Sequence, residues 1–246
     1  MNLPFEPKVF GYAINIHLVM EYLAFFVAYQ YYRYLRKHSK DQISSENRLS
    51  IILGAALGAY LGSRFVGVLE NPLVFNGEVD WYQLTQAKTI MGGLFGGLLG
   101  VEIAKKIIGE DKRSGDLFTL PIVVGIFVGR IGCFLSGIKD FTYGVPTEFF
   151  LGMDLGDGII RHSLALYELL FLLGLFVLLR RVGELNKLAD GELFQLFMVA
   201  YFGFRFFIEF LKPNTFLVLG LSTIQYLCLI CFIYYHRFIL KSLYAK

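Results

Sequence analysis

The sequence predicts an all-α, polytopic membrane protein of seven transmembrane helices, with its N-terminus outside and its C-terminus cytoplasmic. Composition favours this fold class, because 56% of the 246 residues are hydrophobic and only 17% are charged, whereas about a quarter of a typical soluble domain is charged. The charged residues also cluster between apolar runs that are long enough, at about 20 residues, to cross a bilayer as helices. We therefore expect residues 1–246 to form a single integral membrane domain.

The predicted spans lie near residues 13–32, 49–69, 89–108, 117–137, 163–181, 192–211 and 216–238. Close helix packing is expected in the second and third spans, because small residues recur there at every fourth position. The residues with this spacing are Gly54, Gly58 and Gly62 in one span and Gly92, Gly96 and Gly100 in the other. The segment 1–12 has neither a basic n-region nor a cleavage site, so we expect no removable signal peptide.

Lysine and arginine gather in every second connecting segment, which predicts the orientation of the chain. Segments 33–48, 105–113, 180–187 and 237–246 are rich in these residues, whereas 70–88 and 138–162 hold few. By the positive-inside rule the rich segments are cytoplasmic, which places the N-terminus outside and agrees with an odd number of spans. Topology thus accounts for the basic residues. The small net charge of +3 therefore gives no reason to expect a nucleic-acid partner.

Ionisable residues lie within the predicted spans, where each costs about 2.5–3.5 kcal/mol at the helix centre and so marks a candidate functional site. The predicted orientation places most of them in the outer half of the bilayer. Arg205 and Glu209 are four residues apart and can pair with each other, so a purely structural role stays open for them. Arg130 has no such partner in its own span. Because guanidinium groups bind phosphate through paired hydrogen bonds, this cluster indicates an anionic phospholipid headgroup as ligand.

Other classes of function have less support in the residues. The cysteines Cys133, Cys228 and Cys231 form neither a disulfide framework nor a zinc-binding spacing with histidine, and no motif indicates a metal or an organic cofactor. A transporter or channel would need polar residues at both depths of a pathway and an internal repeat. The inner half of the predicted bundle has almost no polar residues, and the sequence has no detectable internal repeat.

Five blocks along the chain resemble, in order, the signatures of the prolipoprotein diacylglyceryl transferase family. Residues 129–137 read GRIGCFLSG and resemble the family's G-R-x-G-N-F-x-N-G. Residues 161–168, RHSLALYE, resemble R-H-P-x-Q-L-Y-E, and residues 201–213 resemble Y-x-x-x-R-x-x-x-E-F-x-R-x-P. Residues 62–67 and 221–225 resemble an early G-x-R segment and the glutamine-bearing start of the last span. The resemblance covers nearly the whole chain.

The resemblance implies a phosphatidylglycerol-dependent diacylglyceryl transferase of the bacterial cytoplasmic (inner) membrane, with its site facing the outer side. Such an enzyme moves the diacylglyceryl group to the cysteine thiol of a lipobox in a precursor protein and releases glycerol phosphate. The implied partners are phosphatidylglycerol or another anionic phospholipid, and lipobox-containing precursors. The implied catalytic residues are Arg130, Arg205 and Glu209. The implied substrate-binding residues are Tyr201, Lys212, Arg64, Tyr167, Glu168, Arg161, His162 and Gly144. Lys212 stands where the family usually has arginine, which keeps the charge and loses the planar fork.

The chain departs from the family pattern around the expected chemical centre. Met91 stands where the family has a histidine before Gly-Gly, and methionine cannot transfer a proton. Cys133 and Ser136 replace the two asparagines of the signature, and Ser163 and Ala165 replace proline and glutamine.

These departures leave the proton acceptor and the activity itself open. A replacement base is conceivable among four residues, Glu209, Asp140, His162 and His17. The alternative interpretations are a non-catalytic relative that binds phospholipid or lipoprotein, and a transferase with another acceptor.

Overall fold

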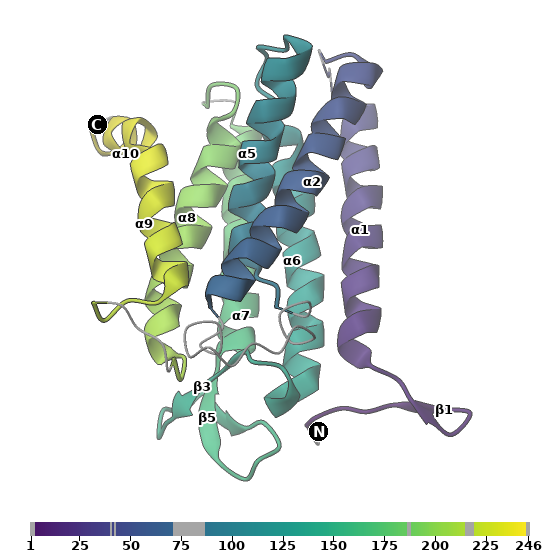
Figure 1. The fold of residues 1–246 in the computed structure, drawn as a ribbon, viewed down its shortest axis with the longest axis vertical. Coiled ribbons are helices and arrows are strands. Elements are labelled where there is room, and N and C mark those ends of the chain that lie inside the picture. The colour runs from purple at the N-terminus through teal and green to yellow at the C-terminus, as the bar shows by residue number, and fades with distance from the viewer. Residues whose placement is uncertain are drawn as a thin grey trace. The chain divides into compact units, whose positions relative to one another are not determined.

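The computed structural model describes residues 3–39, 41, 43–70, 87–185, 188–214 and 219–244, which are mostly helical (Figure 1). The chain divides into two compact units. Unit 1 comprises Met1–Lys40, Gly115–Ala200 and Phe210–Pro213. Unit 2 comprises Asp41–Ser114, Tyr201–Glu209 and Asn214–Lys246.

Unit 1 is built around helix α6 (Asp116–Ser136), which packs against α1 (Ile16–His38) and α7 (Leu164–Glu184). Gly132 lets α1 approach α6 closely, because a Cβ at this position would lie 2.8 Å from the Cβ of Met20. The contact occurs at the start of α1 and near the end of α6. It therefore brings the N-terminal turns of α1 next to the C-terminal turns of α6.

Asp116, in the first turn of α6, fixes the start of α8 (Glu192–Ile208). Its carboxylate accepts hydrogen bonds from the backbone N–H groups of Gly191, at 2.6 Å, and Phe194, at 2.9 Å. A carboxylate at a helix N-terminus satisfies N–H groups that have no partner within the helix. The side chain of a residue distant in sequence thus serves as the cap of α8.

A small antiparallel sheet joins α6 to α7 and was not expected from the sequence. After the short 3-10 helix η1 (Gly137–Lys139), strands β3 (Tyr143–Pro146), β4 (Gly152–Asp154) and β5 (Ile160–Ser163) pair in the order β3-β5-β4. The prediction of an all-α protein was incomplete here, because the strands are too short to produce a clear alternating pattern. A hairpin of β1 (Lys8–Val9) and β2 (Tyr12–Ala13) precedes α1.

Unit 2 is built on the pairing of α2 (Ser45–Leu69) with α5 (Ile90–Ile108), which lie side by side in Figure 1. The close packing predicted from the glycines is confirmed. A Cβ on Gly96 would lie 2.3 Å from the carbonyl oxygen of Gly58, so the two backbones touch directly. Likewise, a Cβ on Gly100 would lie 2.1 Å from the carbonyl oxygen of Gly54.

Several helices of the described chain fit a membrane protein, although the structure supports fewer spans than the sequence predicted. Among the described residues, α2, the Asp116–Lys139 segment and the Glu192–Leu211 segment are long and apolar enough to cross a membrane. The last of these is α8 continued by the 3-10 helix η2 (Glu209–Leu211). A bent pair of helices makes a fourth span if it is counted as one. The other predicted spans coincide with helices α1, α5 and α7, which contain more charged or polar residues.

The predicted span 216–238 is wrong as a continuous helix, and its first residues fall outside the described ranges. Helix α9 begins only at Thr223, after a turn in which Leu219 and Gly220 have positive φ. It ends at Tyr234, and α10 (His236–Tyr244) continues at an angle of 68°. At about 1.5 Å per residue, α9 is too short to cross a hydrocarbon core of about 30 Å. The apolar run was misread as one helix because hydropathy does not report bends.

Candidate functional site

Arg130 and Glu168 form a buried ion pair within unit 1. Arg130 lies near the end of α6 and Glu168 near the start of α7, and the distance from Nε to Oε1 is 2.8 Å. Their side chains are only 8% and 1% exposed. No acid lies one turn from Arg130 on α6, and the structure supplies the carboxylate from the neighbouring helix. A terminal nitrogen of Arg130 also lies 3.5 Å from the sulfur of Cys133.

The sheet of unit 1 brings together Gly144, His162 and Tyr167, which were predicted as binding residues. His162, in β5, shares a hydrogen bond of 2.9 Å with the hydroxyl of Tyr167, in the first turn of α7. A Cβ on Gly144 would lie 2.6 Å from the Cβ of His162 and 2.9 Å from the carbonyl oxygen of Leu211. Only glycine therefore fits between these elements.

Arg161 and Lys212, two further predicted binding residues of unit 1, each lie over an aromatic ring. Arg161 donates from Nε to Asp157, at 2.8 Å, and its guanidinium carbon lies 5.5 Å from the ring centre of Tyr143. The ammonium of Lys212 lies 4.7 Å from the ring centre of Phe141. These contacts are close enough for cation–π attraction, which orients both cations.

Arg205 and Glu209 form the buried pair that their spacing predicted, within unit 2. A terminal nitrogen of Arg205 donates to Oε2 of Glu209 at 3.2 Å, and Glu209 is 1% exposed. Asn214, which the sequence did not single out, donates to both the backbone carbonyl and Oε1 of Glu209, each at 3.2 Å. Tyr201, one turn before Arg205 on α8, is fully buried.

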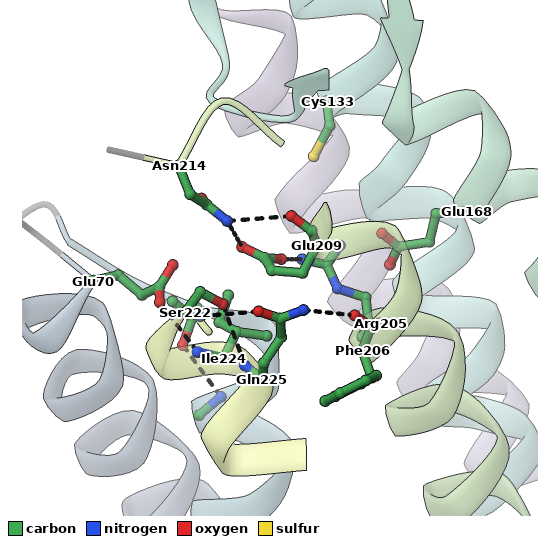
Figure 2. Close-up of polar contacts among 12 residues, drawn as sticks. Glu70, Cys133, Glu168, Arg205, Phe206, Glu209, Asn214, Ser222, Ile224 and Gln225 are labelled. Atoms are coloured by element: carbon green, nitrogen blue, oxygen red, sulfur yellow. Dashed lines mark hydrogen bonds and ion pairs between the residues drawn. The ribbon is translucent and has the colours of Figure 1, made fainter. Parts of the chain in front are cut away.

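Gln225 anchors the start of α9 beside this pair, as Figure 2 shows. Its side-chain oxygen accepts from the N–H of Ser222, while the hydroxyl of Ser222 accepts from the N–H of Gln225, which makes a capping box. The remaining amide hydrogen bond goes from Nε2 to the carbonyl of Phe206, at 3.1 Å. Glu70 accepts from the N–H of Ile224 at 3.1 Å. The glutamine of the last block is therefore explained by helix capping and by its bond to α8.

Arg64 is oriented within unit 2 by a backbone carbonyl and an aromatic ring. It donates to the carbonyl of Ala87 at 3.2 Å, and its guanidinium lies 5.7 Å from the ring centre of Tyr60. Met91 lies in the first turn of α5, which begins after the cap residue Thr89, and is 1% exposed. The position of the missing histidine is thus occupied by a buried side chain that cannot transfer a proton.

Two of the four residues considered as replacement bases approach each other. Nδ1 of His17 lies 3.7 Å from Oδ2 of Asp140, and both side chains are partly exposed. Glu209 is instead buried and bonded to Arg205 and Asn214, and His162 is bonded to Tyr167. Glu209 is thus committed to a buried ion pair, whereas His17 and Asp140 lie beside each other at a partly exposed position.

Comparison with known proteins identifies the family. The family model described as prolipoprotein diacylglyceryl transferase matches residues 7–240. This chain belongs to that family. Among the curated members, the phosphatidylglycerol–prolipoprotein diacylglyceryl transferase of Bordetella bronchiseptica is 34% identical over 73% of this chain and 68% of its own length. The enzyme of the same name from Campylobacter lari is 28% identical, over 96% of this chain and 94% of its own.

The family signatures predicted which residues form the site, but they did not predict which residues bond to one another there. Among the prolipoprotein diacylglyceryl transferase signatures, the arginine of the G-R block and the glutamate of the L-Y-E block turn out to bond each other. Asn214 and Asp157, which bond to Glu209 and Arg161, lie outside these signatures. The spacing of four between Asp157 and Arg161 is a signal that the sequence contained, although in a loop it has no fixed meaning.

Proposed function

We propose that this chain transfers the diacylglyceryl group of phosphatidylglycerol to the cysteine thiol of a lipoprotein precursor. The proposal is carried by one observation. In a member of this family, Arg130 and Arg205 are both retained as buried guanidinium groups, each oriented by a carboxylate. The curated relatives, which are named for this reaction, give further support.

In the proposed reaction the cysteine sulfur attacks the carbon of the diacylglyceryl group that is bonded to a phosphate oxygen. The S–C bond forms as the C–O bond breaks, the thiol proton passes to a base, and glycerol phosphate leaves with the electron pair of the broken bond. Arg130 and Arg205 serve as phosphate ligands, because fixed donors in a dry site stabilise negative charge as it develops. Glu209 orients Arg205, and Glu168 does the same for Arg130.

The binding residues divide by the substrate group that each suits. We propose that Arg64, Arg161 and Lys212 attract the phospholipid headgroup as surrounding cations. The His162–Tyr167 pair offers a hydroxyl and a ring nitrogen to the glycerol or the peptide. Tyr201, buried one turn before Arg205, belongs to the binding region through that neighbour, and Gly144 keeps the sheet close to the chain at Leu211.

The membrane arrangement belongs to the same proposal. We infer that the seven predicted spans cross or enter the bilayer as one integral domain, with the N-terminus outside and the C-terminus cytoplasmic. The distribution of lysine and arginine supports this orientation. The site then faces the outer side of the cytoplasmic membrane, where a lipobox precursor presents its thiol.

The test is release of glycerol phosphate from phosphatidylglycerol by the purified full chain with a lipobox peptide. Arg130→Lys keeps the charge but loses the fork, and we expect at least a tenfold loss of release. Arg180→Lys is the matched control, because Arg180 forms an exposed pair with Glu184, and we expect no change. Release that requires the peptide and falls only in Arg130→Lys supports the transferase.

Met91→His separates the alternatives. No release from the wild type, with phosphatidylglycerol still bound, would reject the lipobox reaction and leave a binding role or another acceptor. Activity that appears only in Met91→His would indicate a lapsed enzyme. Equal activity with and without this histidine would mean that the proton is accepted elsewhere in the chain.

A further inference from the structure

Three side chains that commonly bind metal ions meet within unit 1. His17 lies in the first turn of α1, Cys133 near the end of α6, and Asp140 directly after η1. Their candidate ligand atoms all lie within 4.8 Å of one another. The sequence contains no metal motif because these residues come from separate elements, and only the fold brings them together.

The cluster opens on a cavity of about 390 Å³. His17 and Asp140 line this cavity together with Ser136 and Lys139. The side chains of His17 and Asp140 are 28% and 22% exposed, whereas Cys133 is buried. An ion therefore has a path to the ligands, and the sulfur forms the closed side of the site.

The packing of α1 on α6 fixes the geometry of the cluster. Gly132, next to Cys133, lets α1 come close to α6 one turn after His17, since a Cβ there would lie 2.8 Å from the Cβ of Met20. The hydroxyl of Ser136 donates to the carbonyl of Gly132 at 2.9 Å, and Phe5 donates its N–H to Leu135 at 2.8 Å. The ligand positions are thus set by helix packing and need no large rearrangement on binding.

We propose that His17, Cys133 and Asp140 bind a divalent transition metal, with Zn²⁺ as the ion best suited to this ligand set. Zinc takes imidazole nitrogen, thiolate sulfur and carboxylate oxygen, and a site with three protein ligands keeps a fourth position for water or substrate. That position faces the cavity. On binding, the thiol of Cys133 releases its proton to solvent and the sulfur bonds the metal, so no oxidant or reductant is needed.

The charges around the cluster are compatible with a cation. Thiolate and carboxylate together supply two negative charges for a divalent ion. Arg130 lies beside Cys133, but its charge is balanced by Glu168 at 2.8 Å. This proposal is independent of the transferase reaction, because it concerns binding alone.

The test uses the full chain, purified without a histidine tag, stripped by a chelator and then equilibrated with Zn²⁺ or Co²⁺. We expect one ion per chain by mass spectrometry of the metal. We also expect the Co²⁺ form to show a thiolate charge-transfer band and the visible spectrum of tetrahedral cobalt. His17→Gln, Cys133→Ser and Asp140→Asn should each lower the affinity for Zn²⁺ by at least tenfold, in line with the loss of one ligand.

Matched controls separate a built site from adventitious binding. Cys228→Ser removes another buried thiol and His38→Gln an exposed histidine, and both should retain the ion. No bound metal in the wild type, or a Co²⁺ spectrum without the thiolate band, would overturn the proposal even if a variant failed to fold. Retention in all three site variants, or loss in Cys133→Ser alone, would overturn it too.

Discussion

Substituting Gly96 by alanine tests whether α2 and α5 are held together by direct backbone contact. The added methyl group would lie 2.3 Å from the carbonyl oxygen of Gly58 and 2.8 Å from the Cα of Gly62, where ordinary contacts are 3.4–4 Å. Both obstacles are backbone atoms of α2 and cannot rotate away. The helices must therefore separate by about 1 Å, which forfeits a quarter to a half of the dispersion energy at each contact.

The expected loss of stability in Gly96→Ala follows from a comparison with Gly97, the next residue of the same helix. A Cβ on Gly97 would meet its nearest neighbours, Ala55 and Ala59, at 3.5 Å, which is ordinary contact. Gly97→Ala should therefore show only the gain in helix propensity, which is up to about 1 kcal/mol. Gly96→Ala has the same gain but suffers overpacking of about 1–3 kcal/mol, occasionally more. We expect the two variants to differ by about 3 kcal/mol, using the upper part of that range because backbone must move.

The assay is thermal unfolding of the full chain in detergent, followed by circular dichroism of the helices. For a chain of this size about 3 kcal/mol corresponds to a difference of about 6–12 °C between the midpoints of Gly97→Ala and Gly96→Ala. Equal midpoints would refute the reasoning, because they would mean that α2 and α5 do not pack with backbones in contact. A loss in both variants would show that the whole face of α5 is tightly packed.

Three further predictions concern the polar groups. Glu168→Gln leaves Arg130 buried without its counter-charge and should lower stability by about 3 kcal/mol, whereas Glu184→Gln, in an exposed pair, should leave the unfolding midpoint unchanged. Asn214→Ala removes two hydrogen bonds to Glu209 and should destabilise the chain by about 2 kcal/mol; Asn47→Ala, which removes a single part-buried hydrogen bond to Glu110, is the control in the same unfolding assay and should cost less. The N–H groups of Gly156 and Gly158 donate to Asp154 and hold its pKa below the usual value. Because the folded-state pKa is lowered, these bonds are at full strength above the unfolded-state pKa of about 4 and are lost as pH falls through the lower folded-state pKa. Amide exchange at both glycines, corrected for its intrinsic rate, should accelerate there, and Asp154→Asn should remove this pH dependence; an unchanged profile in that variant would contradict the assignment.

Hydropathy predicted the positions of most helices but not their ends. The first predicted span stopped at residue 32, yet α1 continues to His38 through Arg33 and Arg36. A helix does not need to end where the hydrocarbon ends, because charged side chains extend readily into water. At the C-terminal end the opposite error occurred, since an apolar run concealed the bend at Tyr235. Hydropathy measures where side chains prefer to lie, whereas bends depend on backbone hydrogen bonds.

For the site, the sequence predicted contacts within a helix and missed contacts between elements. The Arg205–Glu209 pair follows directly from a spacing of four, between the last turn of α8 and the start of η2. The Arg130–Glu168 pair depends on how α6 packs against α7, and the approach of His17 to Asp140 depends on how α1 packs against α6. No spacing along the chain encodes these distances. The sheet before α7 was missed for the same reason, because its strands are stabilised mainly by pairing with one another.

If Arg130 and Arg205 hold the phosphate as proposed, the carboxylate beside each of them determines how the phosphate is bound. A lone buried guanidinium is very costly, and a bonded carboxylate offsets much of that cost while the site holds no lipid. The same carboxylate cancels most of the positive charge that a phosphate would otherwise meet. In this proposal the Arg130–Glu168 and Arg205–Glu209 pairs bind the phosphate mainly through hydrogen bonds of fixed geometry, and the attraction by net charge comes from the surrounding cations Arg64, Arg161 and Lys212. Arg130→Lys should therefore impair the reaction even though the charge is kept, because lysine cannot reproduce the planar fork of the guanidinium group.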